Sequence, residues 1–132
     1  MPTSMDILDE LPTDIKELLR QRFTAVDAMD LDAFVTLHSD DHQMVFGHRP
    51  AVVGLADMST QVAEFWKSIQ GLTHNLRRIA QTADRVYVES VVDYDRLDGR
   101  QVQVPVCDVF TIAGGRIAET RAYVDQSPVW EP

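Results

Sequence analysis

Hydrophobic side chains recur at three- and four-residue spacing in the first half of the chain, which predicts helices. The first helix follows Pro12-Thr13-Asp14, because Thr13 can cap a first turn and an acid is favourable there, and it continues over residues 15–26. A second, short helix is predicted over 30–38 and a third over 54–70, which Gly71 ends. The first two helices should form a hairpin whose apolar side covers a sheet.

Alternating hydrophobic and polar residues replace this pattern after Thr73 and predict strands. Short turns rich in Asp, Gly and Ala separate these strands, so consecutive strands should pair as an antiparallel meander. The predicted strands span residues 74–79, 85–96, 101–112 and 116–125, and extended structure is also expected over 43–47 and 52–53.

Three helices followed by a long antiparallel sheet predict an α+β domain. A curved sheet wrapped around the helices leaves a conical hollow, which is a natural ligand cavity. The length of 132 residues suits one domain, predicted over residues 12–132, with residues 1–11 as a loosely docked N-terminal arm.

The composition of the chain argues against some classes of function and indicates a cellular compartment. The formal charge of -9 disfavours binding to nucleic acid or to an anionic membrane surface. No apolar run approaches the roughly 20 residues of a membrane helix, and the first 11 residues lack the basic and apolar regions of an export signal. A cytoplasmic protein is therefore expected. Its single cysteine, Cys107, cannot form an internal disulfide.

A sheet with helices on one face leaves its other face to be covered. The residues predicted on that face are a mixture of polar and apolar side chains, which favours self-association. We therefore expect a homodimer formed through a surface that includes Tyr87, Val91, Gln101, Gln103 and Val109.

Asp108 is the first candidate for chemistry. Alternation along strand 101–112 places it on the more apolar face, with Val102, Val104, Val106 and Phe110. A carboxyl group in such surroundings tends to be protonated, so that it can donate a hydrogen bond to a developing enolate. The alternative is a structural ion pair with one of four arginines, Arg77, Arg78, Arg96 or Arg121.

Two further residues are candidates for acid–base chemistry. Asp125 ends the last predicted strand, where it either reaches the cavity or caps the turn before Pro128. Asp125 is predicted on the opposite face of the strand from Val124, so it could point into the cavity only if a bulge near Tyr123 shifted the alternation. His74 begins a strand among hydrophobic residues, where it is either a cavity donor or acid–base group or a histidine satisfied by the backbone.

The predicted wall of the cavity is largely aromatic and aliphatic. Tyr94 either offers its phenol to a ligand or is an exposed cross-strand aromatic, and Trp66 is either core or a ligand platform. The residues expected to contact a small hydrophobic ligand are Phe23, Phe46, Trp66, Tyr94, Val106, Phe110 and Val124.

The sequence does not favour a metal or cofactor site. His38 and His42 are four residues apart, but the polar residues between them predict solvated loop histidines rather than ligands. A phosphate-binding glycine loop, a nucleophile elbow and a Cys-x-x-Cys motif are all missing from the sequence. We therefore expect neither a metal nor a cofactor.

The order of elements, together with Val104-Pro105-Val106-Cys107-Asp108-Val109-Phe110, Gly115-Arg116-Ile117 and Arg121-Ala122-Tyr123-Val124-Asp125, resembles the nuclear transport factor 2-like superfamily. That superfamily has a cystatin-like, cone-shaped fold and includes ketosteroid isomerase, limonene epoxide hydrolase and the SnoaL-like polyketide cyclases. The resemblance extends from Pro12 to Val129 and indicates the fold more than one activity.

The resemblance also implies roles for individual residues. Asp108 falls where ketosteroid isomerases keep a protonated oxyanion-hole aspartate. Their tyrosine would align with Phe23, and their general-base aspartate with Phe46 or Gly47. Asp125 best matches the acid–base aspartate of SnoaL-like cyclases, with His74 as a possible helper. The Arg-x-Asp pair of limonene epoxide hydrolases has no counterpart here.

These observations favour a cofactor-independent SnoaL-like enzyme that moves a proton on a small hydrophobic carbonyl compound, as a cyclase or isomerase. In this hypothesis Asp125 transfers the proton and a neutral Asp108 binds the enolate oxygen. The alternatives are a non-catalytic protein that binds a hydrophobic ligand and a dimerisation domain. An enzyme should have both carboxylates at one cavity, a binding protein an apolar cavity, and a dimerisation domain a filled one.

Overall fold

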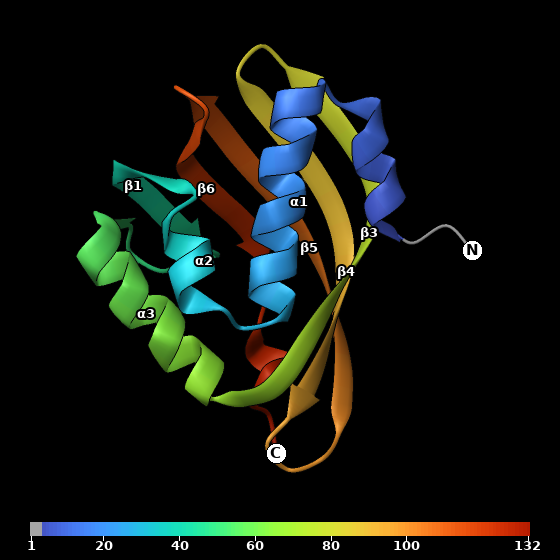
Figure 1. The fold of residues 1–132 in the computed structure, drawn as a ribbon. Helices are drawn as coiled ribbons and strands as arrows, with labels where there is room; N and C mark the ends of the chain where they lie inside the picture. Colours follow the sequence, from blue (N-terminus) through green and yellow to red (C-terminus); the bar gives the residue numbers. More distant parts are fainter. Residues whose placement is uncertain (1–3) are drawn as a thin grey trace.

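The computed structural model describes residues 4–132, which form an α+β fold with helices inside a strongly curved sheet (Figure 1). Asp30 caps the second helix by accepting a hydrogen bond from the Ala33 amide at 3.1 Å, whereas Pro12, not Thr13, precedes the first. The elements are η1 (Ser4–Glu10), α1 (Thr13–Asp27), α2 (Leu31–Val35), β1 (His38–Phe46), β2 (Val52–Val53), α3 (Leu55–Lys67), β3 (Ile69–Thr82), β4 (Arg85–Arg96), β5 (Gln101–Ala113), β6 (Arg116–Val124) and η2 (Ser127–Val129).

The six strands form one sheet in the order β2-β1-β6-β5-β4-β3. Strands β3 to β6 pair consecutively and antiparallel, which confirms the predicted meander. Strand β1 instead runs parallel to β6, from the pair His38 and Ile117 to the pair Phe46 and Ala122. This long-range pairing brings the first strand beside the last and positions α1, α2 and α3 over the concave face (Figure 1).

Several predicted boundaries were wrong: α2 ends at Val35 rather than 38, and β3 extends beyond the predicted 74–79 at both ends. Helix α3 ends at Lys67, because Ser68 turns the chain and donates its hydroxyl to the Phe65 carbonyl at 2.6 Å, so Gly71 lies inside β3. Strand β1 begins at His38, five residues before the predicted start, because this segment pairs with β6.

The N-terminal segment packs against the body of the protein. Residues 4–10 form a 3-10 helix, and Leu8 is fully buried in a cluster with Phe23, Val88 and Phe110. The expectation of a loosely docked arm was therefore wrong for residues 4–11, because Leu8 and Leu11 complete this cluster. Residues 1–3 of the predicted arm lie outside the described residues.

A second cluster of buried side chains fills the space between α3 and the other end of the sheet, and includes Met58, Trp66, Leu72 and Val92. Trp66, Leu72 and Val92 of this second cluster also line a cavity. No helix in residues 4–132 has the length and apolar character needed to span a membrane.

Candidate functional site

A cavity of about 540 Å³ lies between the concave face of the sheet and the helices. Apolar side chains make up much of its wall, and several polar groups stand among them. The buried polar groups are Arg22 from α1, His74 from β3, Tyr94 from β4 and Asp108 from β5, and Gln126 after β6 is half-buried. Arg49, Asp57 and Gln61 line the cavity at exposed positions.

Most of the residues predicted to contact a ligand lie in this wall. They are Phe46, Trp66, Tyr94, Val106 and Val124, together with the candidate acid–base groups His74 and Asp108. The predictions for Phe23 and Phe110 are corrected, because both rings are fully buried in the neighbouring cluster and pack edge to face at 5.9 Å.

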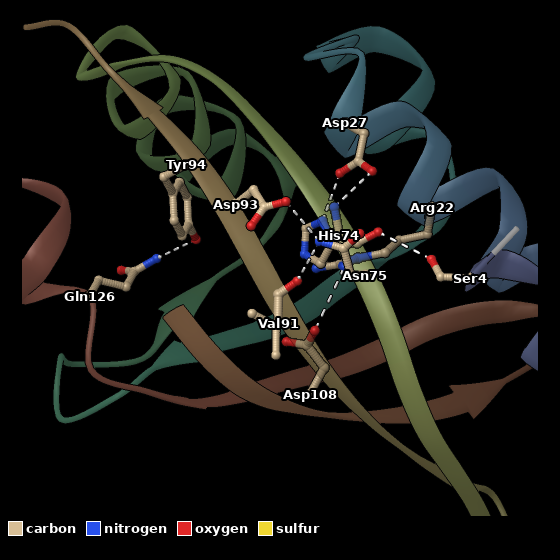
Figure 2. A network of polar contacts seen from close by, with 10 residues as sticks. All are labelled: Ser4, Arg22, Asp27, His74, Asn75, Val91, Asp93, Tyr94, Asp108 and Gln126. Carbon is tan, nitrogen blue, oxygen red and sulfur yellow. Dashed lines mark hydrogen bonds and ion pairs between the residues drawn. The ribbon is translucent and has the colours of Figure 1, made fainter. Parts of the chain in front are cut away.

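His74 is held by Asp27, the last residue of α1 (Figure 2). Its ring Nδ1 lies 2.7 Å from one carboxylate oxygen of Asp27, and its backbone amide donates to the other at 3.0 Å. The carboxylate accepts only, so it selects the tautomer with hydrogen on Nδ1 and leaves Nε2 as a basic nitrogen. Nε2 forms no hydrogen bond with the residues that the structure describes. Asp27 therefore fixes both the orientation and the tautomer of the His74 ring at the cavity.

Arg22 and Asp108 form a second buried pair at the cavity, with 4.0 Å between Nη1 and the nearer carboxylate oxygen (Figure 2). Their side chains are 5% and 3% exposed. Burial lowers the pKa of Arg22, and the charge of Asp108 acts in the opposite direction. The rings of Phe23 and Phe110 each lie 4.9 Å from the guanidinium carbon, so a cation–π contribution adds to the pairing.

The alternative prediction for Asp108, an ion pair with an arginine, was therefore right about the interaction but wrong about which arginine takes part. Three of the four arginines considered pair elsewhere: Arg78 with Glu89, Arg96 with Asp98 and Arg121 with Glu119. The signal for Arg22 was a charged residue within the apolar stripe of α1. Asp27 had no comparable signal, because only the close approach of β3 gives it a partner.

Tyr94 supplies a hydrogen-bond donor to the cavity. Burial raises the pKa of its phenol, so the hydroxyl stays protonated at neutral pH. The side-chain amide of Gln126 donates to the phenol oxygen at 3.4 Å (Figure 2). Because the phenol oxygen accepts in this contact, the phenol keeps its own hydrogen to donate. A ligand oxygen in the cavity can accept it.

Asp125 does not reach the cavity, which corrects its predicted role. It is exposed, and its carboxylate accepts a hydrogen bond from the Ser127 amide at 3.0 Å, which lowers its pKa. No register shift occurs near Tyr123, whose side chain is 64% exposed, so the bulge required for an inward Asp125 is missing from β6. Asp125 instead caps the turn after β6, as the alternative prediction stated.

His38 and His42 are buried in β1 rather than solvated in a loop, because the pairing of β1 with β6 draws the segment inside. Nδ1 of His38 donates to the Phe34 carbonyl at 2.8 Å, and Nε2 of His42 lies 2.9 Å from the Thr120 hydroxyl. Burial lowers the pKa of His38 to about 3 and that of His42 to about 4, so both are neutral. Within residues 4–132, no cluster of three or more His, Cys, Asp or Glu side chains is placed to hold a metal.

Comparison with known protein families identifies one match. The family model of the SnoaL-like domain matches residues 19–120. No curated protein matches the chain by sequence.

One solved structure with the same fold is a Jannaschia sp. CCS1 protein assigned as a SnoaL-like polyketide cyclase. Its sequence is 20% identical, the alignment covers 91% of this chain and 94% of that chain, and the TM-score is 0.77. An LEH-like epoxide hydrolase from M. tuberculosis has 21% identity, coverage of 89% and 87%, and a TM-score of 0.75. A Catenulispora acidiphila protein with a ketosteroid isomerase-like fold, in complex with trimethylamine, has 19% identity, coverage of 88% and 98%, and a TM-score of 0.78. At these identities the likeness shows the shared fold alone. Since the family model covers most of the chain, the protein belongs to the SnoaL-like domain family.

Proposed function

We propose that the protein is a cofactor-independent enzyme that moves a proton on a small hydrophobic carbonyl compound, in a cyclisation or isomerisation. The observation that carries this proposal is the His74–Asp27 pair at the cavity. A buried imidazole whose Nδ1 hydrogen is bound by a carboxylate is oriented to use Nε2 as a general base. Membership of the SnoaL-like family is consistent with this chemistry.

The proposed reaction begins when Nε2 of His74 takes a proton from the carbon next to the carbonyl group. The C–H electron pair becomes part of an enolate, and the imidazolium is stabilised by Asp27. The phenol of Tyr94 donates a hydrogen bond to an oxygen of the ligand. The imidazolium then returns the proton to another atom of the same compound, so the step needs no oxidant or reductant.

This proposal assigns different roles from those expected from the sequence. His74 replaces Asp125 as the acid–base group, because Asp125 is exposed and capped by Ser127. Asp108 lies beside a guanidinium, so we do not assign it the role of a neutral hydrogen-bond donor to the enolate.

The test is exchange of carbon-bound hydrogen for deuterium, measured by proton NMR on 2-tetralone in deuterated buffer. We expect the protein to accelerate exchange at the carbons beside the carbonyl, and His74→Gln to reduce the acceleration roughly hundredfold or more. Asp27→Asn should also reduce it, because the tautomer is no longer imposed. His48→Gln is the matched control, since His48 is exposed and does not line the cavity.

The mainly apolar wall also suits the alternative of a non-catalytic protein that binds a hydrophobic ligand. The two functions predict different results in the same experiment. If 2-tetralone binds but exchanges at the same rate with the wild type and His74→Gln, the catalytic proposal is wrong and the binding alternative is favoured.

A further inference from the structure

Arg22 has unused hydrogen-bond donors in the interior. Its Nε and Nη1 atoms are buried without a hydrogen-bond partner among the residues that the structure describes. The carboxylate of Asp108 lies 4.0 Å away, which balances the charge but is too long for a hydrogen bond. The third nitrogen, Nη2, is not among these fully buried atoms, and Arg22 lines the cavity, so a ligand oxygen in the cavity is a suitable partner for this guanidinium.

We propose that Arg22 and Asp108 together select an uncharged carbonyl oxygen and reject a carboxylate. The inference rests on the proposed function, which places a carbonyl compound in the cavity. It adds that the ligand group bound by Arg22 is uncharged. Arg22 acts here as a specificity-determining residue, while His74 performs the proton transfer.

The charges around Arg22 give the physical reason. Asp108 already balances the single positive charge of the guanidinium, and Asp27 adds a further carboxylate on the same helix. A ligand carboxylate would lose its hydration and place a second anion beside one buried cation, which is unfavourable. A ketone oxygen loses little hydration and gains a hydrogen bond from a charged donor.

Exposed charges at the cavity do not change this balance. Arg49 and Asp57 line the cavity with opposite charges, and both are exposed to solvent. Salt and water therefore screen their effect on a ligand at Arg22. The buried pair decides which group is accepted.

The test compares the binding of 2-acetylnaphthalene and 2-naphthoate, which differ by a methyl group in place of a charged oxygen. Equilibrium dialysis at pH 7 measures both dissociation constants. We expect the ketone to bind the wild type at least tenfold more tightly than the acid, and Asp108→Asn to reverse or abolish this preference by leaving Arg22 unbalanced. Asp125→Asn makes the same chemical change outside the cavity and should leave the ratio unchanged.

A second variant covers the case in which an unpaired Arg22 prevents folding. The double substitution Arg22→Gln and Asp108→Asn removes both charges, and should fold and bind the ketone about tenfold more weakly than the wild type, because the charged donor is lost. The proposal is overturned if the wild type prefers 2-naphthoate, if the ratio is the same in folded Asp108→Asn, or if the folded double variant keeps full ketone affinity.

The outcome is separable from that of the proposed function. Loss of the binding preference would leave the His74-dependent deuterium exchange intact. Failure of the exchange experiment would leave the binding ratio and its dependence on Asp108 as they are.

Discussion

Acidification should destabilise this protein through His38 and His42 well above the pH at which carboxylates dominate. Both rings are neutral when folded, with pKa values of about 3 and about 4, against 6.5 in the unfolded chain. The main cause is burial, and the positive charge of Arg22 acts in the same direction on both. For His42 alone, Glu119 and Asp41 oppose the shift.

The sign follows from proton binding. Between pH 6.5 and about 4 the unfolded chain binds protons that the folded protein does not, so the free energy of unfolding falls as the pH falls. The contribution is fully present above pH 6.5 and is exhausted once the pH is below the folded pKa values. From pH 7 to pH 5, linkage predicts a loss of about 2 kcal/mol for each histidine, or about 4 kcal/mol for both.

Urea denaturation at several pH values between 7 and 5 measures this loss. The variant His38→Asn and His42→Gln keeps an amide near each bonded ring nitrogen, facing the Phe34 carbonyl and the Thr120 hydroxyl, but cannot be protonated. Its free energy of unfolding should depend much less on pH. His48→Gln, at an exposed position, should behave like the wild type.

The comparison between variants removes the contribution of groups common to all of them. If the double variant loses stability between pH 7 and pH 5 as steeply as the wild type, the two histidines are not the cause and the reasoning is refuted. The single variants His38→Asn and His42→Gln separate the two contributions: if only one of them reduces the pH dependence, only that histidine stays neutral in the folded protein.

Three further predictions concern the backbone, the turn after β6 and assembly. In urea denaturation, Gly47→Ala should lower the free energy of unfolding more than Gly114→Ala. Both glycines have a positive φ, and the backbone strain of an alanine there is worth about 1 kcal/mol at either position. Only at Gly47 would the added Cβ also lie 2.8 Å from the Val124 carbonyl oxygen. Asp125→Ala should leave deuterium exchange on 2-tetralone unchanged, and a large loss would return this residue to the mechanism. We also propose that the convex face of the sheet forms a homodimer, so light scattering should give twice the mass of the chain, and Tyr123→Asp should shift it towards monomer; a monomeric wild type at micromolar concentration would contradict this.

Local periodicity determined the elements and the direction of many side chains. The predicted strand 85–96 matches β4 at both ends, and alternation along β5 correctly placed Asp108 on the inner face. Each of these features depends on neighbouring residues in the chain, because side chains alternate along a strand and recur every 3.6 residues along a helix. The α+β fold followed from the order of these elements.

The tertiary structure decided which polar groups meet. Asp27 and His74 are 47 positions apart, and Arg22 in α1 pairs with Asp108 in β5, so no local pattern relates either pair. The parallel pairing of β1 with β6 buries His38 in the same way. A polar side chain is stabilised in the interior by whichever partner packing brings to it, and that partner depends on contacts between distant segments. The sequence therefore determined the fold and the inward position of Asp108, whereas long-range packing determined the acid–base pair.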